Sequence, residues 1–284
     1  MKKNTSMTNV FLTYFQCPIC HTSFHLKDKQ LCCENNHSFD LAKEGYYHLL
    51  PVQQKNSKMP GDNLAMMQAR RAFLAQGFYT PLQKKVVQRC LEEFEEDACV
   101  LDLGCGEGYY TKAIQTSFSG DVIGIDVSKV AIRYASKQAT DVHFAVASAK
   151  SLPLKQNSCD GIIKIFAPFY PESARRVLKE NGKLVSVMPG PLHLQELRAM
   201  IYPTVRPHEV ESTPAGFQRM SLEQLKTTIL LKDDSDLKTL IQMTPFAWKF
   251  TPEKIAHATS RLPLEMTLDF YIASYQCSAS LGVQ

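Results

Sequence analysis

The sequence predicts an α/β fold in which a mostly parallel sheet follows a small cysteine-rich module. Residues 100–109 form an apolar strand that runs into a turn with glycine at every second position, and residues 121–126 form a second short apolar run that ends in a carboxylate. Several cysteines and histidines that could bind a metal ion lie between residues 17 and 37. Strand and helix patterns alternate after residue 100, which implies parallel strands joined by crossover helices.

The glycine turn predicts a site for a nucleoside-bearing cofactor. Gly104, Gly106 and Gly108 allow the backbone to approach a ligand closely and to take positive φ without a Cβ penalty. A dinucleotide fingerprint reads G-x-G-x-x-G instead, and an acid such as Asp102 at the strand end would repel its pyrophosphate. Asp126 follows the glycines by about 20 residues, where a carboxylate accepts hydrogen bonds from ribose hydroxyls. The alternative is an ordinary strand-to-helix turn with Asp126 as a helix N-cap.

Later segments supply the rest of the sheet. Ser128 can cap a helix that ends near residue 137, residues 142–147, 159–167 and 182–188 read as strands, and residues 264–275 could supply the final antiparallel pair. Ligands of such sheets bind at the carboxyl ends of the parallel strands. Side chains from distant segments are therefore expected to converge on one crevice: Asp102, Asp126, Ala147, Ser148, Phe166, Ala167 and His193.

The N-terminal cysteines predict a structural zinc site. Cys17, Cys20, Cys33 and His37 have the spacing of a zinc ribbon, and four protein ligands leave no position for water on a tetrahedral Zn²⁺. The metal would hold together a module of about 40 residues that is too small to bury a sufficient core. Cys32 could ligate in place of Cys33, although adjacent residues point in different directions. Two further spare ligands are His21 and His25.

Composition indicates a globular cytoplasmic protein with an uneven charge distribution. The chain is 44% hydrophobic and 21% charged, and no run approaches the roughly 18 apolar residues that a membrane span needs. Its nine cysteines do not suggest a secreted disulfide framework. Residues 1–90 carry 12 Lys and Arg against 5 Asp and Glu, whereas the remainder carries 20 against 23. Such asymmetry is typical of a module that faces nucleic acid, although solvated lysines also produce it.

Two groups of residues could contact RNA or could serve the fold alone. Asp62 can N-cap a helix over residues 63–76 that carries Arg70 and Arg71, which either meet phosphate or form a solvated face. Residues 53–59 before it read as an exposed polar linker. Phe169 and Tyr170 could stack on a flipped-out base, and packing of their own loop is an equal alternative.

The chain closely resembles the bacterial 23S rRNA (guanine-N1)-methyltransferases of the RlmA type. The resemblance lies in SFD (38–40), AKEGY (42–46), LLPV (49–52), PGD (60–62), MMQARRAFL (66–74), the glycine turn, IFAP (165–168), PGPLHL (189–194) and QMTPFAW (242–248). It implies a class I Rossmann-like S-adenosylmethionine methyltransferase domain, over residues 56–284, preceded by a zinc-ribbon module for RNA recognition over residues 1–55. It also implies a homodimer and favours Cys33 over Cys32 as the zinc ligand. Tyr79 and His193 match a tyrosine and a histidine that lie at the cofactor in that family. The expected cofactor-binding residues are Tyr79, Asp102, Gly104, Gly106, Glu107, Gly108, Asp126, Ser148, Phe166, Ala167 and His193.

The expected reaction is methylation of a guanine ring nitrogen. The end of the fourth strand reads Ala-Pro-Phe-Tyr-Pro rather than the Asn/Asp-Pro-Pro-aromatic tetrad of amino-methylating enzymes. Cys105 and Cys159 are badly placed to act as the nucleophile of carbon-5 methylation, so covalent catalysis is not expected. No general base stands out. Two alternatives are a small-molecule methyltransferase of the same fold and an RNA-binding protein whose cofactor site is vestigial.

Overall fold

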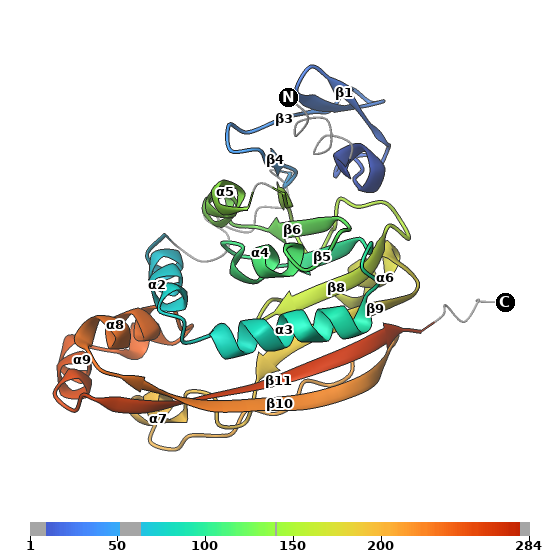
Figure 1. The fold of residues 1–284 in the computed structure, drawn as a ribbon. Coiled ribbons are helices and arrows are strands. Elements are labelled where there is room, and N and C mark those ends of the chain that lie inside the picture. Colours follow the sequence, from blue (N-terminus) through green and yellow to red (C-terminus); the bar gives the residue numbers. More distant parts are fainter. Residues whose placement is uncertain (1–9, 52–63, 140, 279–284) are drawn as a thin grey trace.

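The computed structural model describes residues 10–51, 64–139 and 141–278. A three-stranded antiparallel sheet at the top of Figure 1 consists of β1 (Phe24–Lys27), β2 (Gln30–Cys33) and β3 (Ser38–Asp40). An eight-stranded sheet with helices around it forms the body below. The predicted fold class, an α/β domain behind a small cysteine-rich module, is therefore confirmed.

The larger sheet has the strand order β10-β11-β9-β8-β5-β6-β7-β4. Its strands span β4 Tyr47–His48, β5 Val100–Leu103, β6 Val122–Asp126, β7 His143–Val146, β8 Cys159–Ile165, β9 Leu178–Pro189, β10 Phe217–Leu231 and β11 Leu264–Cys277. Neighbours from β4 through β9 are parallel, whereas β11 runs antiparallel between β9 and β10. The order reverses at β5, and such a switch point is where open α/β sheets bind ligands.

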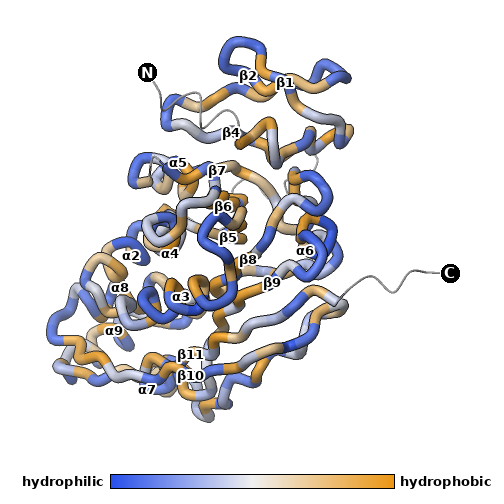
Figure 2. The backbone as a smooth tube through the Cα atoms, turned by 45° about the vertical axis from the view of Figure 1, so that its right-hand side comes forward, coloured by the Kyte–Doolittle hydropathy of each residue, from blue (hydrophilic) through white to orange (hydrophobic). Residues whose placement is uncertain are grey.

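Helices cover both faces of this sheet. They are α2 (Leu64–Ala75), α3 (Thr80–Glu93), α4 (Tyr109–Gln115), α5 (Lys129–Gln138), α6 (Pro171–Val177), α7 (Gln195–Ala199), α8 (Asp234–Gln242), the 3₁₀ turn η2 (Ala247–Lys249) and α9 (Pro252–Thr259), and residues 10–14 are also helical. One buried cluster joins the sheet to α2, α3, α4, α5 and α8, and another joins it to α6 and residues 10–15. Figure 2 shows hydrophobic stretches along the central strands and hydrophilic stretches on the outer loops.

Local sequence explains most element boundaries. Ser128 caps α5 as predicted, because its hydroxyl oxygen accepts a hydrogen bond from the Ala131 backbone nitrogen at 3.3 Å. Strand β8 ends at Ile165, two residues earlier than expected, because Phe166 takes a left-handed φ of 53°. Strand β9 is longer than residues 182–188 and begins at Leu178.

Residues 206–240 contain an outer strand that the sequence did not reveal. We expected residues 264–275 to supply both strands of the final antiparallel pair, but they form only β11. The other strand of the pair is β10, which pairs with β11 along its whole length. Glu223 of β10 contacts Lys85 and Arg89 of α3, each at 2.6 Å, so this strand is tied to the helix across the sheet. Lys164 lies 2.6 Å from Glu211 and holds the preceding loop against β8.

The cysteine-rich part of the chain joins the larger sheet directly. Strand β4 pairs with β7 in parallel, and the Leu49 nitrogen donates to the Val146 carbonyl at 2.8 Å. The ring of Tyr47 lies 4.7 Å from that of Phe11 in the second buried cluster. The predicted linker over 53–59, the Asp62 cap and the division of domains at residues 55 and 56 all lie outside the described residues. Among the described helices, none combines the length and the apolar character that crossing a bilayer requires.

Candidate functional site

Two tight turns bring the predicted zinc ligands together. The Cys17 nitrogen bonds to the Thr22 carbonyl at 2.9 Å, and His21 takes a left-handed φ of 62° inside that turn. On the other side, the Cys33 nitrogen bonds to the His37 carbonyl at 3.0 Å around Asn36, whose φ is 59°. Backbone bonds inside the module therefore set the ligand positions.

The four ligand atoms fit a tetrahedral metal ion. All of them lie within 4.8 Å of one another; the sulfurs of Cys20 and Cys33 are 3.6 Å apart, and the Cys33 sulfur is 3.4 Å from the His37 Nδ1. Zn–S bonds of about 2.3 Å in a tetrahedron place sulfurs about 3.8 Å apart. A hydrogen bond with the Thr22 side chain lowers the pKa of the Cys20 thiol to about 5, which favours the thiolate that zinc binds. Cys32, the alternative ligand, is outside this cluster, and Zn²⁺ would link β2 to the loop before β1.

The glycine turn after β5 has free space on one side, where a ligand would lie, and packs against the protein on the other side. Gly104, Gly106 and Gly108 have φ values of 73°, 56° and 84°. A Cβ on Gly104 would lie 2.5 Å from the Cβ of Ala167, whereas a Cβ on Gly106 would meet nothing within 4 Å. The turn therefore packs against the end of β8 on one side and leaves free space over Gly106.

Asp126 is fixed at the end of β6 by backbone groups. Its Oδ2 accepts a hydrogen bond from the Gly106 nitrogen at 2.9 Å, and its Oδ1 accepts one from the Ser128 nitrogen at 2.7 Å. A carboxylate oxygen can accept more than one hydrogen bond, so these two backbone bonds do not prevent Asp126 from accepting ligand hydroxyls. The Ala147 nitrogen bonds to the Asp126 carbonyl at 3.0 Å, which brings the Ala147–Ser148 corner beside the same residue.

Asp102 lies beneath the turn. Its side chain is 2% exposed, and its Oδ2 accepts a hydrogen bond from the Thr111 hydroxyl of α4 at 2.6 Å. Burial raises its pKa to about 7, and the charge of Asp126 acts in the same direction. These contacts give Asp102 a role in holding α4 to the strand, and its direct contact with a cofactor stays a prediction.

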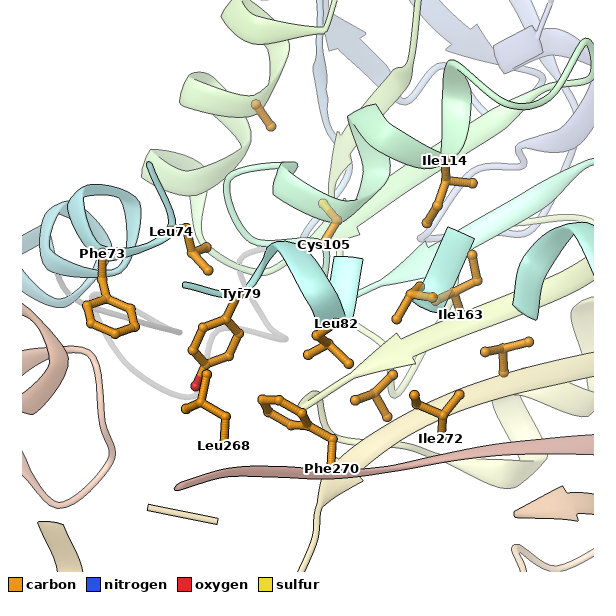
Figure 3. Close-up of a cluster of buried hydrophobic side chains, with 14 of the residues drawn as sticks. Phe73, Leu74, Tyr79, Leu82, Cys105, Ile114, Ile163, Leu268, Phe270 and Ile272 are labelled. Carbon is orange, nitrogen blue, oxygen red and sulfur yellow. The ribbon is translucent and has the colours of Figure 1, made fainter. Parts of the chain in front are cut away.

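An aromatic group from four segments forms another wall near the turn. Phe270 of β11 lies at its centre, 5.4 Å from Tyr79, 4.8 Å from His193 and 5.9 Å from Phe166 between ring centroids. Figure 3 shows Tyr79 and Phe270 in the buried cluster with Cys105 and Leu82 nearby. Tyr79, Phe166 and His193, three separate predictions from the sequence, are therefore joined by Phe270, which sequence reasoning missed.

His193 is held as a neutral imidazole. Its Nδ1 accepts a hydrogen bond from the Asp269 nitrogen at 3.3 Å, so the hydrogen resides on Nε2. Burial lowers the pKa of His193 to about 3, and the nearby His208 and Arg198 lower it further. The imidazole can therefore donate a hydrogen bond from Nε2 at neutral pH, but it is no cationic acid there.

The loop before His193 wraps around the buried carboxylate of Asp269. The Leu192 nitrogen donates to its Oδ2 at 2.9 Å, and the Gln224 amide donates to its Oδ1 at 2.8 Å. A Cβ on Gly190 would lie 2.4 Å from that Oδ1, so the loop needs glycine to approach so closely. Asp269 thus positions the histidine through the loop, and no local sequence signal marked it.

Helix α2 brings positive charge to the turn. Burial raises the pKa of Glu107, and Arg71 and Arg70 oppose this shift. The Arg71 guanidinium also lies 5.2 Å from the centre of the Tyr134 ring. The Tyr110 hydroxyl is buried with no hydrogen-bond partner among the described residues. Arg70 is half-buried and Arg71 is exposed, so both charges act on the turn while Arg71 also lies on the solvated face of the helix.

Three further predicted residues have clear positions. Ser148 is half-buried at the β7 end, where its hydroxyl oxygen accepts a hydrogen bond from the Lys150 nitrogen at 3.2 Å. Phe169 packs against Phe217 at 5.7 Å, as in its packing alternative, whereas Tyr170 is 40% exposed. The loop after β8 therefore offers Phe166 and Tyr170 as exposed rings near the turn.

The crevice fits the predicted cofactor, S-adenosylmethionine. Free space over Gly106 and the Asp126 carboxylate beside it match a ligand that carries a nucleoside. The thiols do not suit covalent catalysis. Burial raises the pKa of Cys105 well above its usual value, and Cys159 is fully buried in the cluster on the α6 side of the sheet.

Comparisons with known proteins agree with this site. Residues 15–58 match the zinc-ribbon model "RlmA, N-terminal", and residues 100–186 match a methyltransferase-domain model. The 23S rRNA (guanine(748)-N(1))-methyltransferase of Streptomyces fradiae is 32% identical over 93% of this chain and 94% of its own. A putative 23S rRNA (guanine-N(1)-)-methyltransferase of Bacillus subtilis is 29% identical over 92% and 96%.

A solved structure, a putative methyltransferase of Bacillus halodurans, aligns over 69% of this chain and 99% of its own, with a TM-score of 0.49 and 15% identity. The zinc-ribbon and methyltransferase-domain matches, together with the cluster of four metal ligands, identify an S-adenosylmethionine-dependent methyltransferase with a structural zinc site. With a relative more than 30% identical along almost its whole length, the chain belongs to the family of 23S rRNA (guanine-N1)-methyltransferases.

Proposed function

We propose that this enzyme methylates N1 of one guanine in a hairpin of 23S rRNA in the cytoplasm. The observation that carries the proposal is the continuous similarity to a 23S rRNA (guanine-N1)-methyltransferase over 93% of the chain, zinc ribbon and cofactor turn together. A methyltransferase for small molecules needs neither a zinc ribbon nor the basic N-terminal third. The intact glycines and Asp126 argue against a vestigial cofactor site.

The reaction requires removal of one proton and precise orientation. Guanine N1 loses its proton, its lone pair forms the N–CH₃ bond, the S–CH₃ bond breaks, and S-adenosylhomocysteine leaves. S-adenosylmethionine supplies the electrophilic methyl group. Holding the two partners in near-attack geometry supplies about 7–11 kcal/mol, so the walls of the crevice contribute more than any one acid or base.

We assign cofactor binding to residues around the open turn. Asp126 would bind ribose hydroxyls, and Tyr79 with His193 would border the methyl donor. The remaining assigned residues are Asp102, Gly104, Gly106, Glu107, Gly108, Ser148, Phe166 and Ala167. The neutral His193 suits hydrogen-bond donation to the oxygen of a deprotonated guanine better than proton removal, since its pKa is near 3.

The N-terminal module would grip the RNA. We assign residues 1–55 to zinc binding and RNA recognition and residues 56–284 to methyl transfer. The excess of Lys and Arg in residues 1–90 supports RNA contact by this third of the chain, which includes the module and helix α2, because phosphate contacts supply much of the affinity for RNA. A rise in salt concentration should therefore weaken binding of the RNA hairpin more steeply than it weakens binding of the cofactor.

We also propose a homodimer in solution. The resemblance to the family supports it, and Met220, Leu222 and Leu230 are exposed apolar side chains on β10, the outermost strand of the sheet. Light scattering during size-exclusion chromatography should give twice the chain mass. A mass equal to one chain over the micromolar range would contradict the dimer.

Mass spectrometry of 23S rRNA tests the proposed reaction. RNA from cells with the gene should contain one 1-methylguanine that is lost from cells without it, and purified enzyme should restore this modification to the unmodified RNA. A matched control is the same strain carrying Asp126→Ala. Unchanged rRNA in the deleted strain, together with methylation of another molecule by the pure enzyme, would overturn the assignment.

A further inference from the structure

A large apolar pocket lies between α2, α8 and α9, at one end of the molecule in Figure 1. Its volume is about 650 Å³, within the range of about 300–1,000 Å³ that small-molecule sites occupy. The lining side chains include Met66, Ile241, Ile255, Trp248 and Lys238, and no carboxylate is among the described lining residues. The pocket is therefore apolar, and Lys238 at its border forms an ion pair with Asp234.

The border of this pocket carries an unusually exposed tryptophan. Trp248 lies on η2 and is 79% exposed, although its ring offers one of the largest apolar surfaces that a protein can bury. The Lys249 Nζ lies 5.1 Å from the centre of the Trp248 ring and 4.2 Å from that of Tyr202. Lys249 has no carboxylate partner in the described part of the chain, so this cation remains available for an anion beside the indole.

Helix α2 connects the pocket to the cofactor turn. Met66 lines the pocket, and Arg70 follows it by one helical turn, about 6 Å along the axis. The charge of Arg70 acts on Glu107 in the turn and on Tyr79 in the aromatic wall. The pocket is therefore a neighbour of the crevice in which we propose that the target guanine reacts.

We propose that this pocket holds a second nucleobase of the RNA substrate, one that flanks the target guanine and stacks on Trp248. The proposal rests on the function proposed above and adds the way in which the loop of the hairpin is held open. An aromatic ring with adjacent cations is how proteins hold unpaired nucleotides, because every base has a π-face and every nucleotide carries a phosphate. Lys249 would meet the phosphate of that nucleotide.

Trp248 is the only tryptophan of the chain, so it reports its own contact with RNA. Tryptophan fluorescence of the full-length enzyme should be quenched saturably by the unmodified 23S rRNA hairpin. The same hairpin with abasic sites beside the target guanine should bind more weakly and quench little. Trp248→Ala should weaken hairpin affinity by about 5- to 150-fold, the range for loss of one base–aromatic stack.

Matched variants separate stacking from general damage. Trp248→Phe should keep most of the affinity, because phenylalanine also stacks. Leu91→Ala removes a 51% exposed apolar side chain near the end of α3 and should leave RNA affinity unchanged. All three variants should bind S-adenosylmethionine as the wild type does, which shows that the fold is intact.

Unchanged fluorescence on saturation with hairpin, or wild-type RNA affinity of Trp248→Ala, would overturn the proposal. Fluorescence that changes with protein concentration rather than with RNA would show a second copy in the pocket and would equally overturn it. A hairpin that quenches Trp248 but gains no methyl group at guanine N1 would refute the proposed reaction and leave the nucleobase site standing. The two failures are thus distinguishable.

Discussion

Gly106→Ala should separate cofactor binding from folding. The new methyl group meets no atom within 4 Å, so the structural cost is limited to placing alanine at a φ of 56°. That conformation costs about 1–2 kcal/mol, which corresponds to a fall in Tm of about 2–8 °C for a domain of this size. The same methyl group projects into the space assigned to S-adenosylmethionine. Overpacking of about 1–3 kcal/mol in that space weakens the cofactor by about 5- to 150-fold.

Gly104→Ala is the matched control. Its φ of 73° carries the same conformational cost, but its Cβ would lie 2.5 Å from that of Ala167, so the end of β8 must move. Its loss of stability should therefore exceed that of Gly106→Ala by about 1–3 kcal/mol. Urea unfolding measures both stabilities, and titration calorimetry with S-adenosylmethionine measures the affinities. Wild-type affinity in folded Gly106→Ala would refute our placement of the cofactor.

Three more predictions concern single groups. Asp126→Ala removes the acceptor of the Gly106 and Ser128 nitrogens. The affinity for S-adenosylmethionine should fall by at least about tenfold in calorimetry, because the ligand also loses its hydrogen bonds to this charged group. Undiminished affinity would place the ribose elsewhere. The folded pKa of Asp102 is about 7, above its ordinary 3.8, so this group's contribution to stability is complete below pH 4 and is lost as pH rises through 7. Asp102→Asn should therefore gain about 2–4 kcal/mol relative to the wild type between pH 4 and pH 8 in urea unfolding, and a pH-independent difference would contradict this reasoning. Cys33→Ser should lose the bound zinc, as measured by atomic absorption, whereas Cys32→Ser should retain it. The reverse result would show that Cys32, and not Cys33, is the ligand.

Strands at the centre of the sheet were predictable because each is short, apolar and followed by a turn signal. β5 and β6 are buried along nearly their whole length, and their sequences need no partner to be recognised. The sequence did not predict β10, because the face of this strand that points inward carries Glu223 and Thr227 among its apolar residues. These two polar residues interrupt the alternation of apolar and polar positions that identifies a strand. Lys85 and Arg89 of α3 compensate that acid, and no local pattern predicts so distant a pairing.

Residues of the site were predictable where a short motif carries the chemistry. The glycine turn, Asp126 and the zinc ligands have fixed spacings, whereas Phe270 and Asp269 act only through tertiary contacts. β11 reads as an ordinary buried strand, and its meeting with the loop around Gly190 depends on the antiparallel pairing of β9 and β11. Such residues are recognised from the folded chain because their neighbours are about 75 positions away.

The two residues of β4 make the zinc ribbon part of the same hydrogen-bonded ladder that carries the reaction centre. An engineer who wishes to retarget the enzyme by exchanging ribbons between homologues must transplant Tyr47 and His48 with the donor and preserve their register on β7. Removal of residues 1–55 would leave the flank of β7 bare and would take the rings of Phe11 and Tyr47 out of the buried cluster that they share with the sheet. Under the RNA-recognition role that we propose for the ribbon, substitutions on its outer surface should therefore alter specificity with less damage to the fold than exchange of whole modules.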